Sequence, residues 1–222
     1  MKTRTHDFTG SLRLVDLSHA ITPGMPVWPG TPGPELIPLA SIASDGFAEQ
    51  SIRLSSHTGT HLDAPAHILE GGATLDRLDP GRFFGSAMIV DALELPGGSI
   101  GLDLLEPYSE MIASVDFVLF HTGWSRYWGQ GLYDQAFPML DDAAASWIAG
   151  IPLKGAGLDC PSFDHPWSRD YPVHRRLLEA GILLIENLTN LHLLPASGFS
   201  LSVFPLGIAG AEACPVRAVA LV

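Results

Sequence analysis

The segment that most constrains the fold lies between residues 154 and 187. It contains two short apolar runs, KGAGLDC (154–160) and GILLIEN (181–187), separated by a stretch that predicts a helix over roughly 173–180. Gly181 is expected to end this helix, because glycine readily adopts the backbone conformation that follows a helix. A strand, a helix and a second strand form one supersecondary unit. The sequence therefore predicts a mixed α/β fold.

Other short apolar runs bounded by turn residues favour the same class. They predict strands at 12–18, 49–56, 86–92, 116–122, 199–206 and 216–222. The run MLDDAAASWIAG (139–150) predicts a helix with acids in its first turn and Gly150 as its stop. With 222 residues, of which 46% are hydrophobic and 16% charged, the chain has the composition of a globular protein with a sizeable core. We predict a single domain over residues 1–222.

A proline-rich segment, ITPGMPVWPGTPGPE, follows the first predicted strand. Its prolines and glycines exclude regular structure, so we expect an ordered loop or arm at about residues 20–35. Trp28 lies within this arm. A tryptophan between prolines serves either as a packing clamp or as part of a ligand pocket, and the sequence favours neither.

Charge and cysteine content exclude several classes of function. The formal net charge of −12 repels phosphate backbones and anionic lipid, so neither nucleic acid nor a membrane is expected as a partner. The sequence shows no signal-peptide pattern and no apolar stretch of about 18 residues. Cys160 and Cys214 form no metal-binding or disulfide pattern and are expected in the core. We predict a cytoplasmic protein.

Three of the nine histidines fall within the segment HTGTHLDAPAH, at positions 57, 61 and 67. In an extended chain His57 and His61 would lie about 13 Å apart, too far to bind one ion. The chain must therefore curl between them, and Gly59 supplies the backbone freedom for this curl. Residues 61 and 63 can point to the same side of an extended stretch. We predict that His57, His61 and Asp63 bind a metal ion, with nitrogen and oxygen donors that suit zinc, manganese or iron(II).

Three further residues complete the candidate site. Three protein ligands leave an open position for water, as in catalytic metal sites, and His67 is the natural proton carrier beside them. His174 opens the predicted helix, and Glu186 ends the strand GILLIE, at the strand end where open α/β sheets place their sites. A glutamate after five apolar residues needs a partner or a bound cation, so both are further candidate ligands.

These motifs resemble the metal-dependent cyclase-like hydrolases, a family that includes bacterial kynurenine formamidases and isatin hydrolases. The resemblance covers most of the chain, with DLSHAITPGMPVWPG, HTGTHLDAPAH, TGW (122–124), the stretch LDCPSFDHPWSRDYPVHRRLLEAGILLIENLTNL and the closing CPVRAVA. It implies a swivelling β/β/α-type mixed sheet, barrel-like, with flanking helices. It also implies a homodimer, or a higher homo-oligomer, in which N-terminal arms are exchanged near the active site.

The resemblance also implies roles for individual residues. His57, His61 and Asp63 would bind one divalent ion, and Asp63 would bridge to a second ion completed by His174 and Glu186. The ions would be zinc, or manganese as the alternative. Trp28 would contact the substrate, and His67 would act as the acid/base while a metal-bound hydroxide attacks the carbonyl.

The predicted reaction is cleavage of the C–N bond of an aryl formamide, such as N-formylkynurenine, or of a cyclic amide. Ala213 and Cys214 stand where the family is expected to have glycine and serine, so the substrate stays open. His19, His121, Asp164 and Arg217 could also line the pocket, but each is equally well explained as structural.

Three other functions fit part of the sequence. His61, Asp63 and His174 have the spacing of the iron site of some oxygenases. That interpretation leaves His57, Glu186 and His67 unexplained. A formal G-x-S-x-G at 97–101, containing Ser99, is the pattern of a serine hydrolase, although Pro96 and Gly97 loosen the strand end that such a site requires. A metal-binding module without catalysis would use the same ligands but would not need His67.

Overall fold

A computed structural model describes residues 5–8, 12–93, 95 and 98–222. Within these residues the main sheet has ten strands, in the order β1-β2-β14-β12-β6-β8-β10-β11-β5-β13. The strands of this sheet are β1 (Thr5–Phe8), β2 (Leu12–Asp16), β5 (His61–Asp63), β6 (Phe84–Asp91), β8 (Phe117–His121), β10 (Gly155–Leu158), β11 (Leu183–Glu186), β12 (Phe199–Ser202), β13 (Ala213–Pro215) and β14 (Val219–Leu221).

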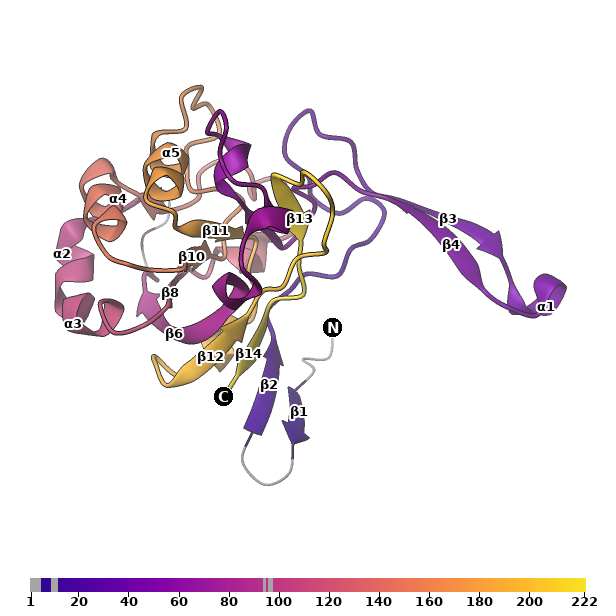
Figure 1. The fold of residues 1–222 in the computed structure, drawn as a ribbon, viewed down its shortest axis with the longest axis horizontal. Coiled ribbons are helices and arrows are strands. Elements are labelled where there is room, and N and C mark those ends of the chain that lie inside the picture. Colours follow the sequence, from indigo (N-terminus) through magenta and orange to yellow (C-terminus); the bar gives the residue numbers. More distant parts are fainter. Residues whose placement is uncertain (1–4, 9–11, 94, 96–97) are drawn as a thin grey trace.

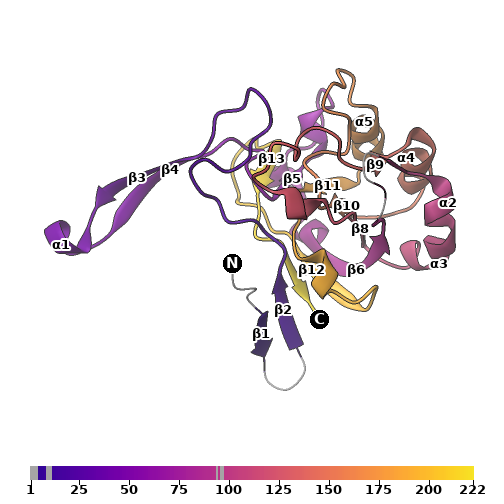
Figure 2. The ribbon, with the colours of Figure 1, turned by 180° about the vertical axis from the view of Figure 1, so that it is seen from behind.

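Two small ribbons, five α-helices and several short 3₁₀ turns complete the described part of the fold. The ribbons pair β3 (Glu35–Ala40) with β4 (Glu49–Arg53), and β7 (Ser99–Ile100) with β9 (Met139–Leu140). The helices are α1 (Ile42–Asp45), α2 (Leu102–Leu105), α3 (Ser109–Ile112), α4 (Asp142–Ala149) and α5 (Pro172–Glu179). Helices α2 to α5 lie together on one side of the sheet (Figures 1 and 2).

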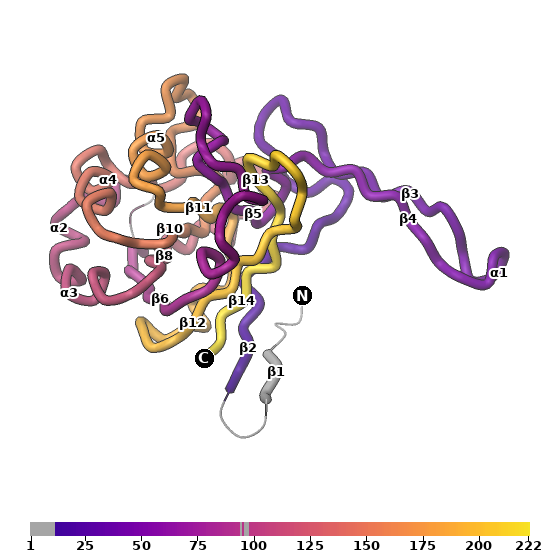
Figure 3. Tube along the Cα trace, viewed as in Figure 1, coloured from indigo at the N-terminus to yellow at the C-terminus, as the bar shows by residue number. Residues whose placement is uncertain are grey.

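The centre of the sheet is parallel and its flanks are antiparallel. Strands β6, β8, β10 and β11 run parallel, while β5 pairs antiparallel with β11 on one side and β12 pairs antiparallel with β6 on the other. The C-terminal strands β13 and β14 lie beside β5 and β2, so the last residues of the chain return to its first half (Figure 3). Segments distant in sequence are thus brought around β5.

The central strands β6, β8 and β11 contribute side chains to two separate cores. In β8, Val118 and Phe120 face the core beneath the helices, while Phe117 and Leu119 face a second core. Successive residues of a strand point to opposite faces, so a parallel strand covered on both sides reads as a continuous apolar run. The second core also takes residues from β2, β5, β6, β11, β12 and β14, which shows that the sheet curls around it. This confirms the predicted mixed α/β class with a barrel-like sheet and flanking helices.

Gly157 allows the inner core of the curled sheet to close. A Cβ atom at this position would lie 2.7 Å from Leu119 Cδ2 and 2.9 Å from Leu188 Cδ1. Both contacts are shorter than real Cβ atoms tolerate, so the strand can approach these leucines only because residue 157 has no side chain.

The structure confirms the predicted strands and helices in kind, with shorter bounds. The helix expected at 139–150 begins only at Asp142, because Asp141 caps its N-terminus through the backbone N–H of Ala144, and residues 139 and 140 form β9 instead. The helix expected at 173–180 is α5, followed by Gly181 with a φ of 76°. Across the described ranges, no helix is both long and apolar enough to cross a bilayer.

The proline-rich segment and the projecting part of the molecule are different elements. Residues 20–34 form no helix or strand, as predicted, and Met25 and Pro34 among them are buried. The element that projects is the hairpin β3–β4 with α1 at its tip (Figures 1 and 2). Its residues are mostly exposed on both strands. The segment 49–56, expected as a strand, therefore supplies the return strand of a projecting hairpin.

Asp116 connects three strands at the start of the parallel sheet. Its Oδ2 accepts hydrogen bonds from the backbone N–H and the hydroxyl of Ser86, at 2.9 and 3.0 Å, and its Oδ1 lies 3.3 Å from Lys154 Nζ. Burial opposes the ionised carboxylate, but the contacts with Ser86 and Lys154 outweigh it and lower the pKa of Asp116. A lowered pKa in the folded state stabilises the fold at pH values above the unfolded-state pKa of about 4.

We therefore predict that Asp116→Asn lowers the free energy of unfolding by about 1 kcal/mol at pH 7, the scale of a partly exposed charged hydrogen-bond group. The difference from the wild type should shrink as the pH falls through the folded-state pKa of Asp116, where the wild-type carboxylate also loses its charge. Urea unfolding of both proteins at pH 7 and pH 3 measures this. An equal difference at the two pH values would contradict the assignment.

Candidate metal centre and active site

The segment HTGTHLDAPAH folds as a tight turn followed by a short buried strand. Gly59 has a φ of 65°, in the region that glycine adopts most easily, and this curl brings the ring of His57 to within 4.9 Å of the ring of His61. Residues 61 to 63 then form β5, so that His61 and Asp63 point to the same side. The expected curl and the expected common face are both confirmed.

Strand pairing places Glu186 opposite the histidine motif. Within the antiparallel pair β5 and β11, Glu186 is the direct partner of His61. Directly opposed residues of such a pair hold their side chains close together. The carboxylate of Glu186 accordingly lies 3.3 Å from His61 Nε2, and its other oxygen lies 3.1 Å from His174 Nε2.

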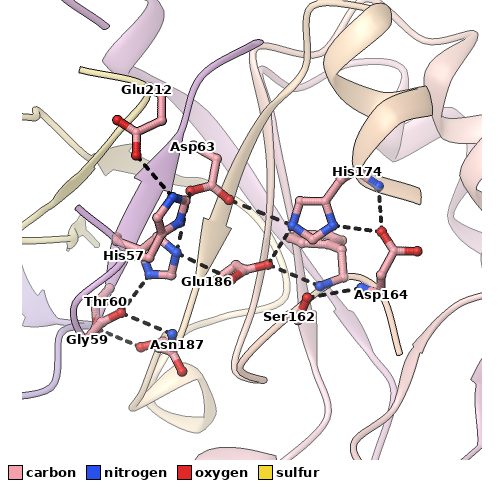
Figure 4. A network of polar contacts seen from close by, with 12 residues as sticks. His57, Gly59, Thr60, Asp63, Ser162, Asp164, His174, Glu186, Asn187 and Glu212 are labelled. Carbon is pink, nitrogen blue, oxygen red and sulfur yellow. Dashed lines mark hydrogen bonds and ion pairs between the residues drawn. The ribbon is translucent and has the colours of Figure 1, made fainter. Parts of the chain in front are cut away.

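Asp63 occupies the middle of this cluster (Figure 4). Its Oδ1 lies 3.0 Å from His57 Nδ1 and 3.4 Å from His61 Nε2, while its Oδ2 lies 3.8 Å from His174 Nε2. The side chain is fully buried. The structure thus brings together all five residues that the sequence predicts as metal ligands. The Asp63 carboxylate lies between the His57 and His61 rings on one side and the His174 ring on the other.

Two of the imidazoles are held so that Nε2 faces the cluster. His61 Nδ1 lies 2.8 Å from the carbonyl oxygen of Gly59, and His174 Nδ1 lies 2.7 Å from Asp164 Oδ2. Both partners accept hydrogen bonds, so each Nδ1 carries the proton and donates it. In metal sites this second contact fixes the orientation of the ring and leaves the other nitrogen free to bind the ion.

Several buried polar atoms in the cluster have no hydrogen-bond partner. They are both carboxylate oxygens of Asp63 and the Nε2 atom of His61. A buried carboxylate without a partner is costly unless a cation lies beside it. Imidazole nitrogens and carboxylate oxygens are the donors that zinc and related divalent ions prefer. The residues present therefore fit a divalent metal ion.

The pKa values of the cluster show how strongly its carboxylates attract positive charge. Burial opposes the charged form of His61, but the charges of Asp63 and Glu186 outweigh it and raise the pKa of His61 to about 9. Burial likewise opposes the charged form of His174, whose contacts with Asp164 and Glu186 raise its pKa to about 10. Burial raises the pKa of Asp63, yet the nearby His57 and His61 bring it well below its ordinary range.

His67 lies beside the cluster but differs from it electrostatically. It ends a short 3₁₀ turn, Pro65–His67, and its ring lies 4.2 Å from that of His57 and 5.7 Å from that of His174. Burial lowers the pKa of His67, with the other imidazoles contributing and Asp63 opposing. A neutral imidazole with a lowered pKa can accept a proton near neutral pH. His67 is also close enough to His57 and Asp63 to share an ion with them.

Sequence reasoning missed or undervalued several supporting residues. Asp164 was only one of several possible pocket residues, yet it holds His174 and also accepts hydrogen bonds from the backbone N–H groups of Val173 and His174 at the start of α5. Glu212 was not considered at all, although its Oε1 lies 3.4 Å from His57 Nε2 (Figure 4). By contrast, Arg217 forms an ion pair with Asp16, and His19 stacks on Trp128.

The cluster opens into a cavity of about 740 Å³. Its walls include Trp28 and Val27 from the proline-rich segment, and Tyr133 and Tyr171 from later loops. Trp28 thus lies in the pocket that the sequence allowed for it. Ser99 is exposed in β7 and is not among the described residues that line this cavity. Pro96 and Gly97, on which the serine-hydrolase reading also depended, lie outside the described residues.

Comparison with known proteins gives a consistent result. Residues 15–165 match the family model Cyclase, described as "Putative cyclase". The kynurenine formamidase of Salinibacter ruber is 34% identical over 94% of this chain and 97% of that protein. Isatin hydrolase A from Ralstonia solanacearum superimposes with a TM-score of 0.83 at 26% identity, over 95% of this chain and 92% of that chain. A structure described as a "Potential Metal-Dependent Hydrolase With Cyclase Activity" gives a TM-score of 0.76 at 28% identity, over 95% and 98%.

The family match covers more than half of the chain, and it includes the whole histidine motif and its strand β5. The fold, the buried His and carboxylate cluster and the sequence similarity agree: this chain belongs to the cyclase family.

Proposed function

We propose that this protein is a metal-dependent hydrolase that cleaves the C–N bond of an amide. The proposal rests mainly on the environment of Asp63. This carboxylate is fully buried, its two oxygens lack hydrogen-bond partners, and imidazoles face it on both sides. The similarity to kynurenine formamidases, to an isatin hydrolase and to metal-dependent hydrolases supports the same reaction class.

We propose two divalent ions, zinc as the first choice and manganese as the second. His57, His61 and Asp63 would hold one ion, and Asp63, His174 and Glu186 would hold the other. The separation of the contacts supports this division, because Oδ1 of Asp63 faces His57 and His61 while Oδ2 faces His174. Ions held there would supply Lewis acidity, which lowers the pKa of water and polarises a carbonyl oxygen.

The protein's own side chains would do the rest of the chemistry. We assign His67 as the acid/base that takes a proton from the attacking water and delivers it to the leaving nitrogen, because it lies beside the cluster with a lowered pKa. Asp164 and Glu212 would hold His174 and His57 in place, since each carboxylate contacts one of those rings.

The cavity favours an aromatic amide. Trp28, Tyr133 and Tyr171 line it, and none of its described lining residues is lysine or arginine. Aromatic walls bind aryl rings by burial and ring contacts. An aryl formamide such as N-formylkynurenine, or a fused cyclic amide such as isatin, is therefore the proposed substrate class.

The competing functions explain less of the structure. An oxygenase site needs only His61, Asp63 and His174, whereas His57 and Glu186 lie in the same cluster. A binding module without catalysis would need no acid/base residue, whereas His67 lies beside the cluster. The cytoplasmic location and the single domain over residues 1–222 stay predictions.

Replacing Asp63 tests the metal site. Asp63→Asn keeps the shape of the side chain but removes the negative charge that lies between His57 and His61 on one side and His174 on the other. We therefore predict at least about 100-fold weaker binding of zinc. Chelator competition and metal analysis after dialysis measure this. Asp103→Asn, at an exposed position of α2, is the matched control and should bind as the wild type does. Wild-type affinity in Asp63→Asn would contradict the assignment.

Replacing His67 tests the reaction. We predict that His67→Ala keeps its metal and loses about 10²-fold or more in kcat, the usual scale of acid/base catalysis. An ultraviolet assay with N-formylkynurenine, isatin and simple cyclic imides measures turnover, and His192→Ala, an exposed histidine, is the control. Unchanged turnover would remove His67 from the mechanism, and loss of metal would make it a ligand instead. Wild-type protein that carries metal but hydrolyses none of these amides would refute the proposed function.

We further propose a homodimer in which the hairpin β3–β4 is the arm that reaches the second copy. The hairpin exposes large apolar side chains, including Leu39 at 60%, Ile42 at 73% and Phe47 at 56% of their surface. An isolated two-stranded hairpin is marginally stable in water, and a set of exposed apolar side chains typically marks an interface. The arm implied by the sequence, residues 20–35, lies instead against its own chain's cavity.

This dimer can be tested at the tip of the hairpin. The double substitution Ile42→Glu and Phe47→Glu should convert the dimer to a monomer in light scattering at about 10 µM, because charges would be buried in the interface. Met111→Glu, at an exposed apolar position on α3, should leave the mass unchanged. An unchanged dimer in the double variant, or a monomeric wild type, would exclude the hairpin as the arm.

A further inference from the structure

A chain of buried hydrogen bonds runs from the wall of the cavity to the back of His61. The hydroxyl of Tyr133 lies 2.8 Å from Asn187 Oδ1, and Asn187 Nδ2 lies 3.0 Å from the carbonyl oxygen of Gly59. The same carbonyl accepts the hydrogen bond from His61 Nδ1 at 2.8 Å. Tyr133, Asn187 and His61 are all buried. Figure 4 shows Asn187 directed toward Gly59.

The direction of every hydrogen bond in this chain is fixed by chemistry. A carbonyl oxygen only accepts, so the amide atom that faces Gly59 must be the NH₂ group of Asn187. Its other atom is then the oxygen, which accepts from the Tyr133 hydroxyl. For the same reason His61 Nδ1 must carry a proton toward Gly59, so that Nε2 points to Asp63 and Glu186.

The backbone around Asn187 is built to hold this side chain. Asn187 has a φ of 58°, in the left-handed region that asparagine tolerates better than most residues. Its backbone N–H donates to the carbonyl of Cys160 at 2.9 Å, and its carbonyl accepts from the hydroxyl of Thr60 at 2.6 Å. Because both backbone groups are hydrogen-bonded, the backbone conformation that directs the Asn187 side chain toward Gly59 is fixed.

We infer that Tyr133 and Asn187 are positioning residues for the metal ligand His61. They fix the Gly59 carbonyl, which fixes the ring orientation and the protonated nitrogen of His61. They also connect this ligand to the cavity, because both residues line it. The inference rests on the proposed metal-binding function of the cluster. Outer contacts of this kind typically change metal affinity or activity by about 10- to 100-fold.

Metal affinity tests the inference with variants that preserve the backbone. Asn187→Gly keeps the left-handed conformation available but removes the amide. Asn187→Asp keeps an acceptor for Tyr133 and places a second acceptor against the Gly59 carbonyl. Tyr133→Phe removes only the hydroxyl. Tyr127→Phe makes the same change on a nearby tyrosine outside this chain of hydrogen bonds, whose ring packs against Trp124.

Competition with a chromophoric chelator gives the affinity for zinc, and the absorption spectrum of the cobalt-substituted protein gives the ligand geometry. We expect about 10- to 100-fold weaker zinc binding in Asn187→Gly and Asn187→Asp, a smaller loss of several-fold in Tyr133→Phe, and altered cobalt spectra in all three. Tyr127→Phe should match the wild type. Nuclear magnetic resonance of the zinc-loaded wild type should show the His61 proton on Nδ1.

A purely structural role would lower the stability of the metal-free protein and leave metal affinity and cobalt spectrum unchanged, and that result would overturn the inference. So would a His61 proton on Nε2. Weaker zinc binding in these variants would support the inference even if the wild type hydrolysed no amide, a result that would refute only the proposed reaction. A wild type that binds no divalent ion would refute both.

Discussion

The structure depends on one constraint, the burial of the Asp63 carboxylate at a point where no hydrogen-bond donor satisfies it. A carboxylate in this position destabilises the fold unless positive charge lies beside it. The chain meets the constraint by surrounding Asp63 with His57, His61 and His174. The second buried carboxylate, Glu186, contacts His61 and His174 and increases the need for positive charge in the cluster. This arrangement suits divalent ions. It is not the arrangement that stability alone favours, because apolar side chains of similar volume often stabilise a core as well as buried charges do.

The fold supplies the rigidity that such a cluster needs. β5 carries His61 and Asp63 between two strands, β11 and β13, and the register with β11 sets Glu186 opposite His61. Helix α5 brings His174 from the other side of β11, and Asp164 holds both the start of that helix and the His174 ring. The proposed ligands therefore stand mainly on strands and helices, while the walls of the cavity come from loops, where substrate preference can vary without disturbing the proposed metal site.

Sequence reasoning was sufficient for residues whose neighbours in sequence are also neighbours in space. The clustering of the candidate ligands in HTGTHLDAPAH could be predicted because Gly59 closes the turn locally, and Glu186 could be added because its position after an apolar strand is costly without a partner. Glu212 and Ser56 are 156 positions apart and meet only because the C-terminal strands return beside β5. The hydrogen bond between Tyr133 and Asn187 likewise depends on tertiary packing that no local pattern encodes. Strand β4 was expected within 49–56, but β3 escaped prediction because it is exposed on both faces and lacks the alternation of a half-buried strand.

The central claim is that Asp63 joins two metal ions in one hydrolytic site. Anomalous diffraction from crystals of the zinc-loaded protein, collected on both sides of the zinc absorption edge, tests it most directly. The account predicts two anomalous peaks, one on each side of the Asp63 carboxylate, the first beside His57 and His61 and the second beside His174 and Glu186. A single peak in the cluster, or peaks only at surface histidines, would contradict it.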